Sequence, residues 1–210
     1  MSLRRQVILL AGAGLLAASA LGSDGDPNAV PPHLTSTNRP VSWARPLKLP
    51  GVSNFYEVTT NLYRGAQPTP EGMKALKAMG IKTVINLRSF HSDQDEVAGT
   101  GLQSIRFETE PWRAEEEDVV AFLKAVTDTN NLPAFVHCRR GADRTGLMCA
   151  MYRIVVCGWT KQDAIGEMKQ GGYHFSPIWE NLVRFIRKAD IADIQRRMAE
   201  PAKTPRPAGG

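Results

Sequence analysis

Polar and apolar positions alternate along the middle of this chain in blocks that predict helices and strands in turn. Apolar residues repeat at helical spacing in two stretches, 69–79 and 114–127. Thr69-Pro70 opens the first stretch and Gly80 follows it, which is typical of the start and the end of a helix. We therefore predict a helix in each stretch.

Shorter apolar runs between the helical stretches predict strands. These runs are 82–87, 102–107 and 134–136, and the last is preceded by Pro133. Short apolar runs bounded by turn residues are typical of buried strands. Stretch 145–157 is apolar nearly all round, which favours a central helix.

Capping residues predict two further helices toward the C-terminus. Thr160 has Asp163 three residues on, and Ser176 stands before Pro177. Strands that alternate with helices predict an α/β fold, here a single domain with a central, mostly parallel sheet of about four to five strands flanked by helices. In such sheets the functional residues lie at the carboxyl edge.

The first twenty residues have the layout of a secretory signal peptide. Arg4 and Arg5 precede an uncharged, mostly apolar stretch that ends in Ala18-Ser19-Ala20, a small-x-small cleavage site. We expect export to the periplasm or secretion, and the paired arginines suggest the twin-arginine route. The alternative is an uncleaved N-terminus that anchors the domain at the inner membrane.

The flanking segments differ in composition from the middle of the chain. Residues 21–51 and 199–210 are rich in Pro and polar residues and lack periodicity, so they are predicted to be a linker and a disordered tail. The domain is then 52–198, long enough to bury a substantial core.

The charge balance argues against a nucleic-acid partner. The chain carries a formal net charge of +5, two charges of which are Arg4 and Arg5 in a leader without acids, which leaves +3. That value is too mild for a nucleic-acid-binding surface. The histidines at 33, 91, 137 and 174 show no metal-ligand spacing, so no metal or other cofactor is expected.

The segment His137–Gly146 carries the chemistry. A cysteine, Cys138, and an arginine, Arg144, are separated by five residues that include Gly141. A helix N-terminus and a guanidinium lower the pKa of a thiol from about 8.5, so Cys138 is expected to be a thiolate nucleophile. Arg144 would bind phosphate oxygens through two N–H groups, and Gly141 would let the backbone amides turn toward the anion.

Neighbouring residues of this loop have supporting roles. The hydroxyl of Thr145 is expected to stabilise the sulfur, and His137 to orient the loop rather than act as a base. Backbone amides through Ala142 complete the anion cradle. Asp143 is expected to pair with or orient an arginine, or to help with proton transfer.

The pattern His137-Cys138-x5-Arg144-Thr145 resembles the signature of cysteine-dependent protein tyrosine and dual-specificity phosphatases. Segments 61–68 and 83–88 are similar to the compact atypical dual-specificity phosphatases of bacteria and, as inositol-pyrophosphate enzymes, of plants and fungi. The loop version Gly141–Gly146 is closer to the bacterial members and to lipid-phosphatase loops. The resemblance covers about residues 52 to 190.

The resemblance implies a two-step, metal-free hydrolysis of phosphate monoesters through a cysteinyl phosphate. It also implies an acid, usually Asp, about thirty residues before the cysteine, but segment 107–113 holds no Asp. Glu110 is our first choice and Glu108 the second, and either could instead be a solvated carboxylate. The acids at 115–118 fall in the first turn of a helix and are read as capping residues.

The family places the side chains of Arg139 and Arg140 beside the bound phosphate. Two cations there favour a multiply phosphorylated or acidic substrate: a phosphorylated protein, on tyrosine or on serine and threonine, or an inositol phosphate or phospholipid. Alternatively, one faces solvent and the other pairs with Asp143 or a glutamate. Arg88 and His91 are expected to border the pocket, and the protein is expected to be a monomer that contacts membranes at most transiently.

Three alternatives stay open. Cys149 and Cys157 are read as core residues, but a disulfide of either with Cys138 would switch activity off. A non-catalytic phosphate- or phosphoprotein-binding module is the second alternative, because the usual Asp is missing. A sulfurtransferase is the third.

Overall fold

The computed structural model describes residues 39–201; the predicted signal peptide and the segments 21–38 and 202–210 lie outside the described residues. Six strands form one sheet in the order β1-β2-β3-β6-β4-β5. Their bounds are β1 Arg45–Pro46, β2 Tyr56–Thr59, β3 Leu62–Ala66, β4 Thr83–Asn86, β5 Gln103–Arg106 and β6 Ala134–Cys138.

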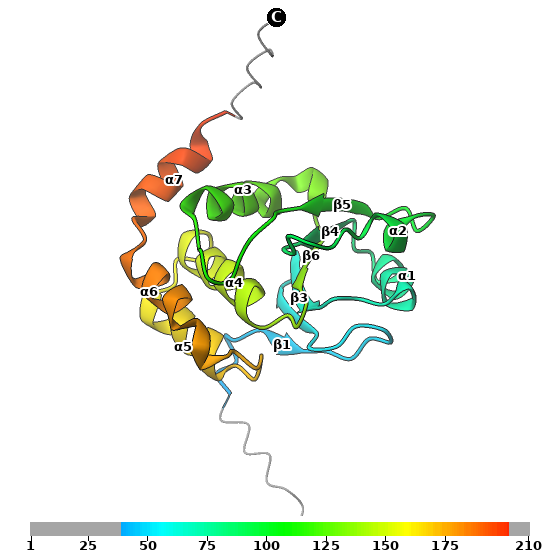
Figure 1. The fold of residues 1–210 in the computed structure, drawn as a ribbon, viewed down its shortest axis with the longest axis horizontal. Coiled ribbons are helices and arrows are strands. Elements are labelled where there is room, and N and C mark those ends of the chain that lie inside the picture. The colour runs from blue at the N-terminus through cyan, green and yellow to red at the C-terminus, as the bar shows by residue number, and fades with distance from the viewer. Residues whose placement is uncertain (1–38, 202–210) are drawn as a thin grey trace, which may run out of the picture. The chain divides into compact units, whose positions relative to one another are not determined.

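Helices cover both faces of this sheet. They are α1 Pro70–Ala78, α2 Gln94–Val97, α3 Glu116–Thr127, α4 Asp143–Val155, α5 Lys161–Gln170, α6 Glu180–Lys188 and α7 Ile191–Ala199. Figure 1 shows α1 and α2 on one side of the sheet and α3 to α7 on the other. A hydrophobic cluster fills each side, the larger one around α4. Within the described residues, no helix has both the length and the apolar character that a membrane span requires.

The predicted α/β class and the mostly parallel sheet are confirmed, but the predicted strand number is wrong. The pairs β3–β6, β6–β4 and β4–β5 are parallel, whereas β1–β2 and β2–β3 are antiparallel. The strands missing from the prediction lie at the N-terminal end of the domain. β3 carries Arg64 and Gly65 in its interior, which interrupt the apolar pattern that marks a buried strand.

Two of the predicted helix caps are confirmed and one is wrong. The hydroxyl of Thr69 accepts a hydrogen bond from the amide of Gly72, and that of Thr160 from the amide of Asp163. Ser176 makes no side-chain cap, because a short 3-10 turn, Pro177–Trp179, precedes α6. The central helix α4 begins at Asp143, two residues before the predicted start.

The linker was predicted to extend to Gly51, but residues 39–51 pack on the domain. Ala44 is 1% exposed, and β1 pairs with β2. The guanidinium of Arg39 donates to the hydroxyl of Tyr173 at 2.8 Å. These contacts come from backbone pairing and one long cation, which hydropathy does not reveal.

A buried ion pair holds this N-terminal segment. The carboxylate of Glu167 accepts from Arg153 Nε at 2.9 Å, from the Tyr173 hydroxyl at 2.8 Å and from the amide of Ala44 at 2.5 Å. Both members of the ion pair, Arg153 and Glu167, are less than a tenth exposed. One carboxylate therefore joins α4, α5 and the segment before β1.

Replacing Glu167 with alanine is expected to lower the free energy of unfolding by about 3–5 kcal/mol, because it leaves Arg153 buried without its partner. Urea denaturation measures this loss. Glu180→Ala is the control, since its ion pair with Lys169 is more than a third exposed and worth less than about 1 kcal/mol. Equal losses in the two variants would contradict the assignment.

Candidate active site

The cysteine loop lies where three parallel strands end. Cys138 is the last residue of β6, α4 begins at Asp143, and β6 lies between β3 and β4 in the sheet. The carboxyl ends of parallel strands meet at one edge of a sheet. The predicted position of the loop at this edge is therefore confirmed.

The thiol of Cys138 lies at the base of this loop and is 3% exposed. Burial raises the pKa of Cys138, but hydrogen bonds from the hydroxyl and amide of Thr145, the charge of Arg144 and the amide of Arg140 outweigh it. The pKa of Cys138 is therefore lower than that of an ordinary thiol. A lowered pKa makes the sulfur a nucleophile at lower pH.

The Thr145 side chain is fully buried beneath the loop. Its hydroxyl oxygen is buried and has no hydrogen-bond partner by distance and angle within residues 39–201, so its hydrogen is available to the nearby sulfur of Cys138. This arrangement fits the role predicted for Thr145.

Replacing Thr145 with valine keeps the side-chain volume and is expected to raise the pKa of Cys138. Because the thiolate forms only above this pKa, alkylation of Cys138 by iodoacetate at a fixed acidic pH should slow about three- to tenfold, the equivalent of one hydrogen bond of about 0.5–1.5 kcal/mol. Thr127→Val, on the exposed end of α3, is the control. An unchanged pH profile for Thr145→Val would show that the hydroxyl does not act on the sulfur.

The guanidinium of Arg144 is held in place from one side. Its Nη1 donates to the carbonyl oxygens of Leu87 at 3.0 Å and Thr109 at 3.1 Å. Its Nε and Nη2 make no hydrogen bond to the described residues. Arg144 thus keeps two donors for a phosphate in the cleft that it shares with Cys138.

Arg64 fixes the loop from below. It is 2% exposed, and its Nη2 donates to the carbonyl of Gly141 at 2.8 Å. Its guanidinium carbon lies 3.7 Å from the ring centroid of Tyr173. Sequence reasoning missed this contact with the loop; the available signal was a charged residue inside an apolar strand.

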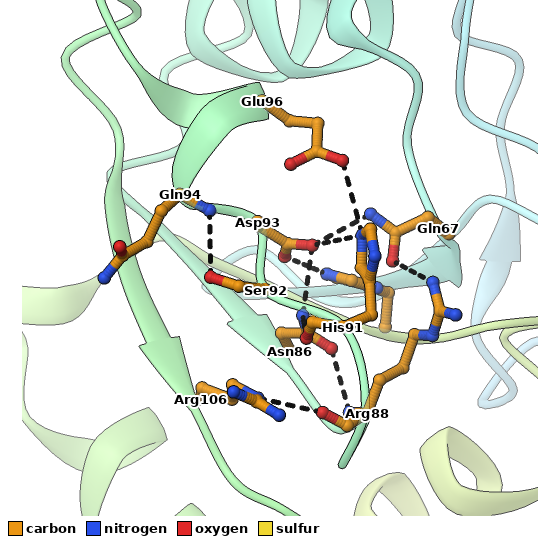
Figure 2. A network of polar contacts seen from close by, with 10 residues as sticks. Gln67, Asn86, Arg88, His91, Ser92, Asp93, Gln94, Glu96 and Arg106 are labelled. Carbon is orange, nitrogen blue, oxygen red and sulfur yellow. Dashed lines mark hydrogen bonds and ion pairs between the residues drawn. The ribbon is translucent and has the colours of Figure 1, made fainter.

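His137 is completely buried and forms a hydrogen bond through Nε2 to Asp93 Oδ2 at 2.7 Å. This contact is consistent with the predicted role of His137 in orienting the loop. Sequence reasoning missed Asp93, because an aspartate in a polar stretch is typically a solvated side chain. Figure 2 shows Asp93 at the centre of a network with Gln67, Asn86 and His91.

The expected role of Asp143 in pairing with an arginine is wrong. Its Oδ1 accepts a hydrogen bond from the amide of Ser176 at 2.8 Å, and among the described residues it forms no ion pair. This bond attaches the turn that carries Trp179 to the start of α4. Asp143 therefore shapes the cleft instead of orienting a guanidinium.

Two clefts open beside the loop. The first, of about 170 Å³, is lined by Pro111, Cys138, Arg139, Arg140, Asp143, Arg144 and Trp179. The second, of about 200 Å³, is lined by Arg88, Ser89, Phe90, Glu110, Pro111, Trp112, Arg139 and Arg144. The two share their lining at Pro111, Arg139 and Arg144, so they meet at the phosphate-binding loop.

Arg139 and Arg140 are both exposed at the mouth of the site, and their side chains are unpaired among residues 39–201. The alternative in which one of them pairs with Asp143 or a glutamate is therefore not observed. Arg88 lines the second cleft, as expected, and burial and the charges of Arg144 and Arg139 lower its pKa. Three guanidinium groups thus crowd the second cleft, which favours a negatively charged ligand.

The carboxylates before the loop differ in position. Glu110 is half-buried and lines the second cleft beside Arg144. Glu108 is exposed and faces Arg106 at 3.3 Å. Glu115 and Asp118 line a small cavity together with Glu110 and Arg144. Burial and the nearby Glu115 raise the pKa of Asp118.

His91 does not line either cleft, so the expectation for it is wrong. Its Nε2 lies 3.4 Å from Asp93 Oδ1 and 3.3 Å from Glu96 Oε1, and these three residues are a donor set suited to a metal ion. Both oxygens of Asp93, however, already accept hydrogen bonds from protein groups. We interpret the three residues as part of a network of polar contacts (Figure 2).

The three cysteines of the chain are free thiols. Cys149 is buried in the core on α4, and burial raises its pKa to about 11. Cys157 is half-buried and packs against the same core. Both positions agree with the predicted packing role.

The comparisons with known proteins agree with this geometry. Residues 52–175 match the family described as DSP-PTPase phosphatase fused to NAD+ kinase. The dual specificity protein phosphatase TpbA of Pseudomonas aeruginosa strain UCBPP-PA14 is 33% identical over 181 residues, which are 83% of this chain and 80% of TpbA. Inositol diphosphatase DSP3 of Arabidopsis thaliana is 26% identical over 69% of this chain and 73% of DSP3.

Solved structures give the same result. The crystal structure of P. aeruginosa TpbA superposes with a TM-score of 0.70 at 30% identity, covering 77% of this chain and 99% of that one. A TpbA variant in complex with pTyr has a TM-score of 0.70 at 29% identity, over 78% and 99% of the two chains. The chain therefore belongs to the DSP-PTPase phosphatase family and is a cysteine-dependent phosphatase.

Proposed function

We propose that this phosphatase acts on phosphotyrosine in acidic protein segments, with Cys138 as the nucleophile. The sulfur attacks phosphorus as the bond from phosphorus to the leaving oxygen breaks, and a carboxylic acid protonates that oxygen. Water then attacks the cysteinyl phosphate, which releases inorganic phosphate and restores the thiolate. Arg144 and the amides of the loop from Arg139 to Ala142 stabilise the charge on the equatorial oxygens.

The observation that carries this proposal is a deep nucleophile under an aromatic rim. Cys138 is 3% exposed, whereas Phe90 is 92% and Trp112 62% exposed beside the adjoining cleft. A phosphotyrosine is long and rigid enough to reach a recessed sulfur, and its ring would stack on these aromatic side chains. The TpbA complex with pTyr supports the same substrate class.

The arginines of the mouth support a preference for acidic neighbours of the phosphotyrosine. Arg139 and Arg140 are exposed and unpaired within the described chain, and Arg88 lies in the second cleft. Cations placed around a cleft attract anionic groups and discriminate against cationic ones. Carboxylates that flank the phosphotyrosine would meet these side chains.

The same arginines favour a second candidate, an inositol phosphate with several phosphate groups. Two curated relatives at 26% and 27% identity are inositol diphosphatases. Such a substrate would place one phosphate on the loop and another against Arg88 and Arg139. The aromatic rim has no role in this alternative, which is why we rank it second.

Initial rates with a chelator present decide between these substrates. The panel contains one phosphotyrosine peptide with acidic flanks, the same peptide with neutral flanks, its phosphoserine counterpart and inositol polyphosphates. We expect the highest kcat/KM for the acidic phosphotyrosine peptide, and Arg139→Gln should raise its KM more than that of the neutral peptide. A higher kcat/KM for the inositol substrates would favour the second candidate, and no turnover of any substrate would favour a binding module.

We propose Glu110 as the general acid, because it is the half-buried carboxylate beside Arg144 in the second cleft. Glu110→Gln is expected to lower kcat by about 10²–10⁴ for phenyl phosphate, whose leaving oxygen needs a proton. The loss should be small for nitrophenyl phosphate, whose leaving group departs as an anion. Glu108→Gln, on the exposed carboxylate, is the control.

Two nearby acids are the alternative candidates for the general acid, and their substitution tests the assignment of Glu110. Glu115→Gln and Asp118→Asn remove the carboxylates that share the small cavity with Glu110. If one of them shows the leaving-group dependence and Glu110→Gln does not, that residue is the acid instead.

The cellular location is proposed from the sequence pattern of residues 1–20. We propose that the leader directs export and that the enzyme acts as a monomer outside the cytoplasm. A fusion of residues 1–51 to a reporter that is active only after export tests the first part, and light scattering tests the second. Contact with membranes is expected only if a phospholipid proves to be a substrate.

A further inference from the structure

Asp93 is a buried carboxylate that neither cleft exposes. Its side chain is inaccessible to solvent, and it stands directly before α2. An aspartate at this position typically caps the helix, but its side chain makes no capping hydrogen bond here. Another function must therefore account for its burial.

The partners of Asp93 lie at or just beyond the carboxyl ends of three different strands. Oδ2 forms a hydrogen bond with Nε2 of His137 at 2.7 Å. Oδ1 accepts from Nε2 of Gln67 at 2.9 Å and from Nδ2 of Asn86 at 3.0 Å, as Figure 2 shows for the two amides. One carboxylate thus receives three donors.

These donors surround the catalytic loop. His137 directly precedes Cys138 on β6, and Asn86 lies opposite His137 in the parallel register of β4 and β6. Gln67 follows β3, and its backbone N–H donates to the carbonyl oxygen of Arg139 at 3.4 Å. Asp93 therefore links the carboxyl ends of β3, β4 and β6 around the first residues of the loop.

The chemistry of this contact restricts His137. An ionised carboxylate only accepts hydrogen bonds, so Nε2 of His137 carries the proton that Asp93 receives. Burial raises the pKa of Asp93. The hydrogen bond and charge of His137 and the contacts of Gln67 and His91 lower this pKa by more, so its net shift is downward and the carboxyl remains ionised. A buried anion is tolerated only when it is paired, so the network resists rearrangement.

We propose that Asp93 is a positioning residue of the phosphatase reaction: it holds His137, and through it Cys138 and the loop amides, in the geometry that stabilises the thiolate and the transferring phosphate. This inference rests on the proposed role of Cys138. Asp93 touches neither substrate nor sulfur and acts through His137.

Asp93→Asn tests the inference, because the amide nitrogen of asparagine cannot accept the hydrogen bonds that one oxygen of Asp93 now receives. We expect kcat/KM for an aryl phosphate to fall by about 10²-fold, the usual cost of a misplaced catalytic group. The pH at which iodoacetate alkylates Cys138 should move upward, because misaligned amides stabilise the thiolate less. Alkylation needs no turnover, so this readout is separate from the failure of any proposed substrate.

A double-mutant cycle shows whether Asp93 acts through His137. In a protein that already carries His137→Gln, Asp93→Asn should lower kcat/KM little further. If the two residues acted independently, the fold-losses of the single variants would multiply in the double variant. Glu96→Gln is the matched control, because Glu96 faces the same His91 but makes no bond to His137. We expect it to stay within about twofold of the wild type.

Two outcomes would overturn the proposal: a folded Asp93→Asn protein with an unchanged alkylation profile, or effects that multiply with those of His137→Gln. If Asp93→Asn does not fold, Gln67→Ala decides instead, since it removes one donor to Asp93 and leaves the His137 contact. We expect a smaller upward shift of the alkylation profile for Gln67→Ala, and no shift would overturn the proposal.

Discussion

Replacing Cys138 with serine is expected to lower phosphate release from an aryl phosphate by at least about 10³-fold, because a serine hydroxyl is not ionised near neutral pH and removing a nucleophile leaves only binding and charge stabilisation. Rates measured with a chelator present check this expectation. Cys157→Ser changes a half-buried cysteine two residues beyond the end of α4 and should keep full activity.

Binding experiments complete this test. The Cys138→Ser protein keeps Arg144 and the loop amides, so it should still bind phosphate in a titration. Residual turnover near the wild-type rate would remove Cys138 as the nucleophile. A wild-type protein that binds phosphate and vanadate but hydrolyses no member of the substrate panel would be a binding module.

Replacing Gly141 with alanine is expected to disrupt the loop. Gly141 has a φ of +66°, and a Cβ there would lie 2.3 Å from the carbonyl carbon and oxygen of Gly65. These are backbone atoms of the neighbouring strand β3, so they cannot move aside as a side chain can. We expect activity to fall by about 10²-fold or more and stability to fall by more than about 1 kcal/mol.

Gly158→Ala is the matched control for this prediction. Gly158 has a φ of +72°, but a Cβ there meets no atom within 4 Å, so it reports the conformational cost alone. Urea denaturation and initial rates separate the two effects. If Gly141→Ala lost no more stability and no more activity than Gly158→Ala, the close approach to β3 would not matter.

The general architecture was predictable where the pattern is local. The helices α1 and α5 begin at the predicted caps, and β4, β5 and β6 occupy the three apolar runs. The strand β3 was missed because its side chain Arg64 is charged, although it is buried beneath the loop. The cost of burying that guanidinium is offset by the carbonyl of Gly141 and the ring of Tyr173, which no local pattern contains.

The catalytic loop was readable from the sequence because its chemistry is contiguous. Ten consecutive residues hold the nucleophile, the glycine that turns the backbone and the arginine that binds the anion. One segment therefore indicates the reaction and also forms the anion site. Cys138, Arg144 and Thr145 lie as their spacing predicted.

Only the tertiary structure decided which other groups serve this loop. Asp93 and Arg64 lie 45 and 74 residues before Cys138 in the sequence, and they reach the loop because β3 and β4 end beside β6. The sequence ranked Glu110 before Glu108, but only the fold places Glu110 in the cleft beside Arg144 and leaves Glu108 exposed. The sequence by itself determined the chemistry of one loop, whereas the order of parallel strands, a non-local property of the fold, determined what surrounds it.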